Sequence, residues 1–513
     1  MFDSLYGSEL PVVGGNRAAW WKAVVERAES APANIVPGLL GSTLKAAGKT
    51  YEVRGSTLRQ LPGLVRDLRG NDLLIAIERP PPATNEALAI GIAGRGFGGN
   101  LTSDSTRLDG YVLSTDVAPT ILRRLGVSIP SQMSGQPIRS GGAVDVGEVV
   151  SLGNRLATIS ERRGPVIGVS LAVWLVGLAL AIAATRGRAG RPGTRLVGLS
   201  VIYLPLLLLA GAALEPSQTA EQLLVMLGAP SLGLLTLVAL GGYRALAVAS
   251  GLTVLAYAVD VVAGSPLTSL SLLGPNPGLG VRFYGIGNEL EALLAVLIVA
   301  GTGAGLSGFA ARLPPRGCAA AFLVVGIVLS FVFAAGRFGA DVGAAIVFPV
   351  GAAVSAAAIA ARRRRTALLV VAAPFVAVAL LALVDLASGA NAHLTRSVLD
   401  AGGLNDLADV AQRRLQLSAR SFTRPIVFVF MPLVAALVVL AVLRRDRLRA
   451  WLRGHPAMRA GLIGAVAATA VGTLANDSGA LLLEIGAAYL LVFAGYAWAE
   501  SSRPGEARSI DYP

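Results

Sequence analysis

The chain has few of the residues that metal sites and covalent cross-links usually require. Its 513 residues include one cysteine, Cys318, and two histidines, His393 and His455. A single cysteine excludes an intramolecular disulfide and a cysteine-ligated metal cluster. Two histidines are too few for most zinc sites, which use several His or Cys ligands. We therefore predict neither a metal site nor a cofactor.

Charged residues are also scarce. They make up 15% of the chain, against about 25% in a typical soluble domain. Hydrophobic residues make up 54%, and the mean hydropathy is +0.65. The apolar residues form separate runs rather than one block, so a single membrane anchor does not account for them. The composition predicts a protein that crosses a membrane many times.

The net charge of +13 comes mostly from short basic clusters between the apolar runs. Such clusters are typical of cytoplasmic loops that orient membrane helices. No basic groove with stacking aromatic residues accompanies them, which argues against nucleic acid as a partner. The expected partners are membrane lipids.

Apolar runs recur from residue 164 onward, and each is long enough to cross about 30 Å of hydrocarbon as a helix. The sequence predicts an α-helical polytopic bundle of about 11 transmembrane helices over residues 164–500, and a cytoplasmic tail over 501–513. The predicted spans lie near residues 165–185, 195–214, 221–241, 244–263, 286–306, 317–335, 342–361, 366–386, 425–443, 459–475 and 479–498.

Loop charge predicts the orientation of these spans. The strongly basic short loops follow the first, third, fifth, seventh and ninth spans, so they share one side, which the positive-inside rule assigns to the cytoplasm. Residues 1–163 would then lie outside. Residues 1–15 have neither the basic nor the apolar segment of an export signal. Either translation starts upstream of Met1, or the first span acts as a reverse anchor; we expect the former.

Residues 1–163 are mixed in polarity and rich in Gly and Pro, with strand-like pieces such as Leu73–Ile77 and helix-like pieces such as Ala18–Ala28. They are predicted to form a small α/β domain. The segment PGLLGSTLKAAG, residues 37–48, resembles a helix of the alkaline phosphatase and sulfatase superfamily. The segments at 101–112, 114–126 and 133–138 resemble the end of that fold, where a TDxAPTxLxxLG helix precedes an MxGxP turn.

The resemblance implies an alkaline-phosphatase-like fold, but not its activity. Members of that superfamily bind divalent metals through several Asp and His side chains and attack with Ser or Thr. A two-metal site needs ligands that hold the ions about 4 Å apart. No histidine precedes His393, and no segment matches the part of the fold that carries the nucleophile. The domain is therefore predicted to be an inactive remnant, with Asp116 capping a helix that Pro119 opens.

Charged and amide side chains near the outer ends of the spans are the candidate functional residues, because charge inside a membrane is costly and marks cavities or partners. The predicted catalytic or proton-relaying residues are Glu289, Asp341 and Asp477. The predicted substrate-binding residues are Arg282, Asn288, Arg337, Asn476 and Glu484. Arginines bind phosphate or carboxylate groups through two parallel hydrogen bonds. Salt bridges and caps within each loop are the structural alternative, and a shared site requires one outer cavity.

The strings RFYGIGNE, GRFGAD and NDSG are similar to those of uncharacterised bacterial multi-pass proteins that carry the phosphatase-like region in front. That resemblance implies a multi-pass protein of the bacterial plasma membrane and no particular activity. Three functions remain open. The protein could handle an anionic, phosphate-bearing, lipid-linked envelope substrate such as a polyprenyl phosphate, as an enzyme or a carrier. It could be an ion- or proton-coupled secondary transporter, or a non-catalytic envelope scaffold.

Overall fold

The computed structural model describes residues 17–30, 35–49, 52–53, 58–78, 87–133, 135–275, 283–360, 376 and 415–501. Within these ranges it contains 16 α-helices and two small sheets. The chain divides into two compact units, Met1–Asn154 and Arg155–Pro513. Each unit is described by itself.

The amino-terminal unit combines short helices with two antiparallel strand pairs. Strand β1 (Leu73–Ile77) pairs with β2 (Ile90–Gly94), and β3 (Asn100–Thr102) pairs with β4 (Arg139–Gly141). The helices are α2 (Arg17–Ser30), α3 (Leu39–Ala46), α4 (Leu61–Arg66), which the short 3₁₀ helix η1 (Leu58–Gln60) precedes, and α5 (Ser114–Arg124). The predicted strand at Leu73–Ile77 and the helix around Ala18–Ala28 are confirmed.

Helix α5 begins at Ser114, so the prediction that Pro119 opens it is wrong. Asp116 lies in the first turn, and its side chain accepts a hydrogen bond from the backbone N–H of Leu113 at 3.0 Å. The missing N–H of Pro119 leaves the carbonyl of Thr115 without its usual helical donor. Gly135 packs against this carbonyl so closely that a Cβ there would lie 2.0 Å from the oxygen.

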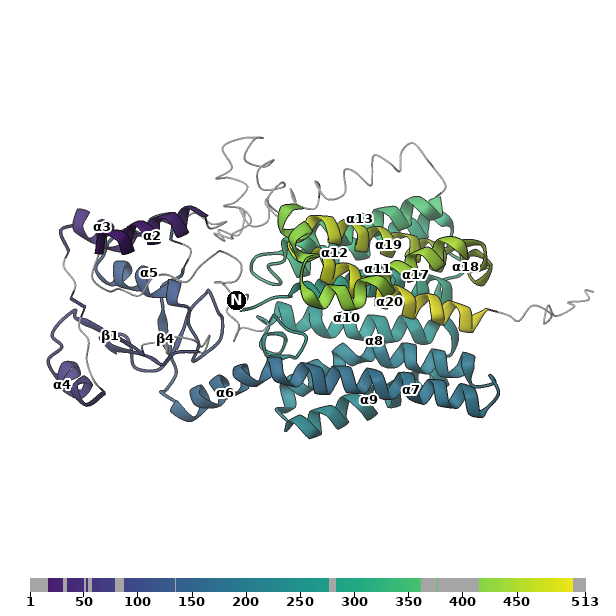
Figure 1. Cartoon of the computed structure of the whole chain (residues 1–513), viewed down its shortest axis with the longest axis horizontal. Helices are drawn as coiled ribbons and strands as arrows, with labels where there is room; N and C mark the ends of the chain where they lie inside the picture. The colour runs from purple at the N-terminus through teal and green to yellow at the C-terminus, as the bar shows by residue number, and fades with distance from the viewer. Residues whose placement is uncertain are drawn as a thin grey trace, which may run out of the picture. The chain divides into compact units, whose positions relative to one another are not determined.

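The carboxyl-terminal unit is a bundle in which long apolar helices lie side by side along a common direction (Figure 1). Its helices are α6 (Val146–Arg163), which begins before the unit boundary, α7 (Val169–Ala184), α8 (Gly190–Leu214), α9 (Gln218–Leu240), α10 (Gly242–Val262), α11 (Asn288–Phe309), α12 (Pro315–Ala334), α13 (Val342–Ala360), α17 (Pro425–Leu443), the short α18 (Arg445–Trp451), α19 (Pro456–Ala475) and α20 (Gly479–Glu500). A short 3₁₀ helix, η3 (Thr268–Leu270), follows α10.

Nine helices in the described ranges are long and apolar enough to cross a membrane, and the bent pair of α17 and α18 raises the number to as many as 10. The prediction of a multi-pass membrane protein is confirmed. The span predicted at 366–386 lies outside the described residues, apart from residue 376. The other predicted spans all coincide with helices.

The first span differs from its prediction because the helix starts much earlier. Helix α6 continues through a π-helical segment, η2 (Gly164–Gly168), into α7, giving one helix of 39 residues from Val146 to Ala184. Residues 146–163 are polar on one face only, which suits a helix but not a membrane span. The sequence pattern therefore located the apolar part and missed the polar part.

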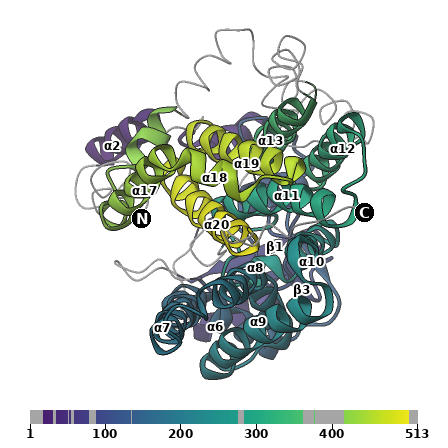
Figure 2. The same ribbon diagram turned by 90° about the vertical axis from the view of Figure 1, so that its right-hand side faces the viewer.

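Helix α11 lies at the centre of the bundle, among α10, α12, α13, α19 and α20 (Figure 2). It packs against α19 and α13, and these two helices pack against each other through small residues. A Cβ at Gly464 of α19 would lie 2.0 Å from Ser355 Oγ and 2.3 Å from the carbonyl oxygen of Gly351, both on α13. Close backbone approach through glycine is a common way for membrane helices to associate. These three helices consequently fit tightly together.

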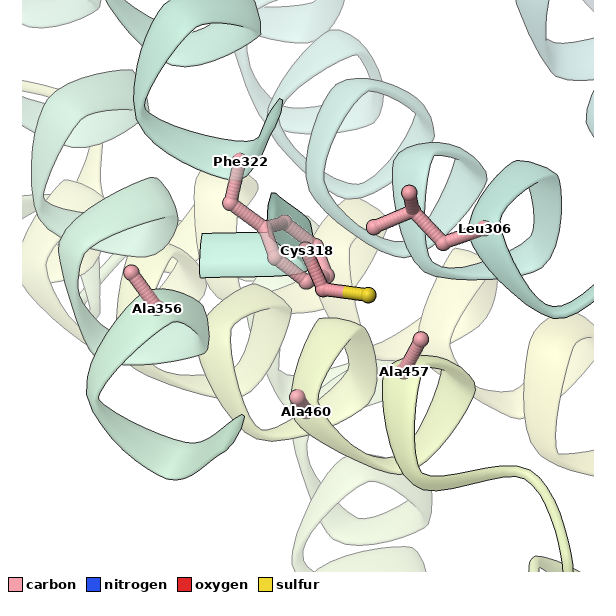
Figure 3. Close-up of a cluster of buried hydrophobic side chains, with 6 residues drawn as sticks. All are labelled: Leu306, Cys318, Phe322, Ala356, Ala457 and Ala460. Carbon is pink, nitrogen blue, oxygen red and sulfur yellow. The ribbon is translucent and has the colours of Figure 1, made fainter. Parts of the chain in front are cut away.

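Apolar side chains fill the space between α11, α12, α13 and α19 near the end of α11 and the start of α12. The cluster consists of Leu306, Cys318, Phe322, Ala356, Ala457 and Ala460 (Figure 3). The Cys318 sulfur points toward Leu306 and Ala457 in this view. Cys318 is 5% exposed and behaves here as a small apolar residue.

The two ends of the bundle differ in charge. At the basic end, where α8, α10 and α12 begin, Arg195 forms an ion pair with Glu500 at 2.7 Å, and Tyr496 donates to the carbonyl of Gly242 at 2.9 Å. The predicted basic loops after α7, α9 and α11 lie at this end. The opposite end, where α11, α13 and α20 begin, is here called the polar end. It holds the described candidate residues.

Candidate functional site

Two loops meet at the polar end through their backbones. The N–H of Ile286, just before α11, donates to the carbonyl of Gly339, just before α13, at 3.3 Å. Gly285 has a φ of 75°, and a Cβ there would lie 1.9 Å from the Gly339 oxygen. Only glycine suits both this conformation and this approach. The loops that precede α11 and α13 are thus fixed against each other.

Glu291, in the first turn of α11, has a fully buried side chain at this end. Its Oε2 accepts a hydrogen bond from Asn476 Nδ2, at the end of α19, at 2.6 Å. Asn476 is 6% exposed. Burying a carboxylate costs several kcal/mol unless it is protonated or held by donors or a cation. The pair therefore joins α11 to α19 through an interaction that is sensitive to charge.

A second buried carboxylate lies next to the first. Asp341 is 3% exposed, and its Oδ1 accepts from the N–H of Gly343 at 3.3 Å. Both carboxylate oxygens of Glu291 would lie 2.4 Å from a Cβ placed on Gly343. The carboxyl groups of Glu291 and Asp341 therefore flank one glycine in the first turn of α13. Helix N-termini stabilise negative charge, but two adjacent ionised carboxylates repel each other.

The rest of the first turn of α11 continues this network. Asn288 Nδ2 donates to Oδ1 of Asp477, which lies just before α20, at 3.0 Å. Glu289 Oε1 forms an ion pair with Arg163 Nη1 at 3.4 Å, and Arg163 Nη2 also donates to the carbonyl of Gly274 at 2.8 Å. The network thus connects α11, α13, α19, α20 and the end of α6.

Five of the candidate residues, Asn288, Glu289, Asp341, Asn476 and Asp477, belong to this network, which we call the carboxylate cluster together with Glu291 and Arg163. The guanidinium carbon of Arg337 lies 4.6 Å from the ring centroid of Phe338 and 5.8 Å from that of Phe331. Glu484 lies farther along α20, and its Oε1 is buried without a hydrogen-bond partner among the described residues. Arg282 lies outside the described residues.

Arg337 and Asp341 are four positions apart in the sequence, a spacing that allows an ion pair on a helix. The chain between α12 and α13 is a turn rather than a helix, and Ala340 has a φ of 51°. The backbone N–H of Asp341 donates to the carbonyl of Phe333 at 3.1 Å, and its side chain is buried. The turn brings the carboxylate to the start of α13.

Sequence reasoning missed the arginines of α6. Arg155 pairs with Glu215, Arg162 with Glu221 at 3.4 Å, and Arg163 with Glu289. Positions 155, 162 and 163 fall on one side of a helix, seven and eight residues apart. That spacing could have indicated a row of ion pairs. Their acidic partners are Glu215 and Glu221, near the start of α9, and Glu289, at the start of α11. The polar half of the long helix is thereby tied to the bundle.

Carboxylates of the amino-terminal unit have structural partners. Asp116 is fully buried, and its oxygens accept from Ser103 Oγ and Ser105 Oγ at 2.6 Å, and from the N–H of Gln136 at 2.8 Å. Asp104 forms an ion pair with Arg139. Among the described residues, no group of three or more His, Cys, Asp or Glu side chains could hold a metal ion. The occupied oxygens of Asp116 hold the TSDST loop and the MSGQP turn together.

Two cavities lie away from the carboxylate cluster. One, of about 440 Å³, lies between α10, α11 and α12. The other, of about 140 Å³, lies near Cys318 and His455 at the basic end. No family model, curated protein or solved structure matches the chain.

Proposed function

We propose that the chain is a secondary transporter of the bacterial plasma membrane, in which Glu291 and Asp341 bind a proton or a monovalent cation. The observation that carries this proposal is the presence of two buried carboxyl groups beside Gly343. Two carboxyl groups this close favour sharing a proton or holding a cation over carrying two charges. Binding or releasing the proton or cation changes the charge of Glu291 and Asp341, and with it the contacts between their helices.

Several features support a site that responds to ion binding. The cluster joins five helix ends, and irregular loops precede both α11 and α13. Ion-coupled transporters place carboxylates and broken backbone at such junctions. The basic loops favour an amino-terminal unit outside the membrane and a cytoplasmic tail. In that orientation the cluster faces the outer side, and the amino-terminal unit, with its phosphatase-like strings, is a binding module without catalysis.

The first test measures ion binding without needing the substrate. The full chain in detergent should show a melting temperature that depends on pH, or on NaCl replaced by choline chloride at constant ionic strength. A ligand at 100 times its dissociation constant adds about 2.7 kcal/mol of stability, which amounts to a few degrees for a protein of this size. Glu291→Gln and Asp341→Asn should each reduce the dependence on pH or sodium, because an amide neither titrates nor holds a cation.

The matched control is Asp446→Asn. Asp446 lies at the basic end, and its side chain is 82% exposed, so its replacement should leave the dependence unchanged. Charge movement after a pH or sodium jump, measured on proteoliposomes, provides the second readout. The proposal is wrong if Glu291→Gln and Asp341→Asn both keep the ion dependence of the wild type.

A second candidate function is the handling of an anionic, lipid-linked envelope substrate. It is favoured by the contact between the loops of Ile286 and Gly339, because Arg282 and Arg337 belong to these two loops. Native mass spectrometry of the purified chain should then detect a polyprenyl phosphate. Arg337→Gln should abolish its retention, whereas Arg316→Gln at the basic end should not. Equal retention in both variants rejects this candidate.

A further inference from the structure

The cavity between α10, α11 and α12 is a mostly apolar groove whose lining includes three glycines. Gly251 of α10 and Gly301 and Gly305 of α11 lie along it, with Leu252 and Leu329 among the residues of its sides. Leu252 is 47% exposed, so the groove opens onto the outside of the bundle. A Cβ at Gly251 would meet nothing within 4 Å. Because this surface lies within the membrane-spanning part of the helices, the groove faces lipid chains.

An arginine lies at one end of this groove. Phe309 lines the cavity, and the guanidinium carbon of Arg244 lies 5.6 Å from the centroid of its ring. Arg244 Nε donates to the carbonyl of Gly308 at 2.8 Å. Its two Nη atoms have no hydrogen-bond partner among the described residues, and the residue is exposed. Arg312 follows Phe309 by three positions. Positive charge therefore accompanies the apolar groove where it reaches the basic end.

We propose that this groove binds one acyl chain of an anionic phospholipid, whose phosphate is held by the Nη groups of Arg244. An apolar cavity of about 440 Å³ gains van der Waals contacts when a flexible chain fills it. A guanidinium donates two parallel hydrogen bonds to a phosphate. The contact with Gly308 fixes Arg244 beside the groove, so head group and chain are recognised together.

This site is separate from the proposed transport function. It lies on the lipid-facing side of α10, α11 and α12 and at the basic end, whereas the carboxylate cluster lies at the polar end. The lipid would contact α10 and α11 at once, across the close approach of Gly301 to Ser250, where a Cβ would lie 2.8 Å from the serine Cβ. Its expected role is to stabilise the packing of these helices from the membrane side.

The test fills the groove without a clash. Gly251→Leu places a side chain in open space inside the cavity, so the variant should fold. Gly177→Leu is the matched control, because Gly177 lies on α7, outside the cavity, and a Cβ there also meets nothing within 4 Å. The full chain in detergent is mixed with dioleoylphosphatidylglycerol or dioleoylphosphatidylcholine. Native mass spectrometry counts the retained lipid, and thermal unfolding measures the stabilisation.

The wild type and Gly177→Leu should retain phosphatidylglycerol in preference to phosphatidylcholine and be stabilised by it. Gly251→Leu should lose both effects. Arg244→Gln should lose about tenfold in the preference for phosphatidylglycerol, because the choline cation of phosphatidylcholine offsets the phosphate charge that the guanidinium attracts. Unchanged retention in Gly251→Leu, or an unchanged preference in Arg244→Gln, overturns the proposal. A dimer that Gly251→Leu converts to a monomer, with lipid retention unaffected, would instead assign the groove to a second copy of the chain.

Discussion

Replacing Asp116 by asparagine should loosen the amino-terminal unit at two identifiable backbone amides. Oδ1 of Asp116 accepts from Ser105 Oγ and from the N–H of Gln136, and Oδ2 accepts from Ser103 Oγ and from the N–H of Leu113. An asparagine side chain has one acceptor oxygen and one NH₂ group that only donates. Whichever way the amide turns, the NH₂ group faces either Leu113 or Gln136.

The size of the effect follows from that geometry. A serine hydroxyl can rotate and accept a hydrogen bond from the new NH₂ group, whereas a backbone N–H cannot. One buried donor is therefore left unsatisfied, at a cost of about 1–3 kcal/mol. Asp116→Ala leaves both backbone donors unsatisfied and should cost about 2–6 kcal/mol by the same reasoning. The destabilisation should thus increase from the asparagine to the alanine variant.

Hydrogen exchange followed by mass spectrometry on the full chain provides the measurement. Protection should fall in Asp116→Asn at whichever of Leu113 and Gln136 faces the new NH₂ group, about tenfold for each 1.4 kcal/mol. Asp104→Asn is the control: its carboxylate is 61% exposed in the ion pair with Arg139, and such surface pairs contribute about 0–1 kcal/mol. Wild-type protection at both amides in Asp116→Asn would refute the assigned hydrogen bonds.

Two further predictions concern the bundle. Gly464→Ala should lower the melting temperature, because its Cβ would lie 2.0 Å from Ser355 Oγ and 2.3 Å from the Gly351 oxygen, and overpacking of about 1–3 kcal/mol exceeds the helix-propensity gain of about 1 kcal/mol. Gly177→Ala, in open space, should not lower it; equal melting temperatures would contradict the packing. Burial lowers the pKa of His455. As the pH falls, this histidine therefore takes up a proton in the unfolded chain at a higher pH than in the folded chain. The free energy of unfolding should consequently decrease as the pH drops through about 6.5. Thermal unfolding from pH 8 to 5 should show a smaller slope in His455→Gln than in the wild type, and an equal slope in both would reject the assignment.

The apolar helices and strand β1 could be predicted because they depend on local pattern. Apolar runs define the spans, and Leu73–Ile77 is a short apolar run of strand length bounded by polar residues. The polar half of the long helix was missed, since residues 146–163 lack the hydropathy of a span. Its arginines find their partners on other helices, and one sequence does not specify such pairs.

The site residues show the same limit more sharply. Glu289 and Glu291 look alike in the sequence, yet Glu291 is fully buried while the Glu289 side chain is 26% exposed. Two residues along a helix turn the side chain by about 200°, so neighbouring acids face different surroundings. Which of them faces α13 and α19 depends on how the helices pack. The hydrogen bond from Asn288 to Asp477 joins positions 189 residues apart, and no local sequence pattern indicates such a contact.

The glycine contacts between α11, α13 and α19 have a mechanical consequence. Helices whose backbones touch at Gly351, Gly461 and Gly464 cannot slide along one another without collision, so these three must move as one rigid block. Glu291, Asp341 and Asn476 lie at the ends of these three helices. The distances between them should therefore stay the same when other helices of the bundle move. The 3.4 Å ion pair between Arg163 and Glu289 connects the block to the long helix of Val146–Ala184. Arg163 is therefore the residue through which a change of charge at Glu289 would act on the long helix.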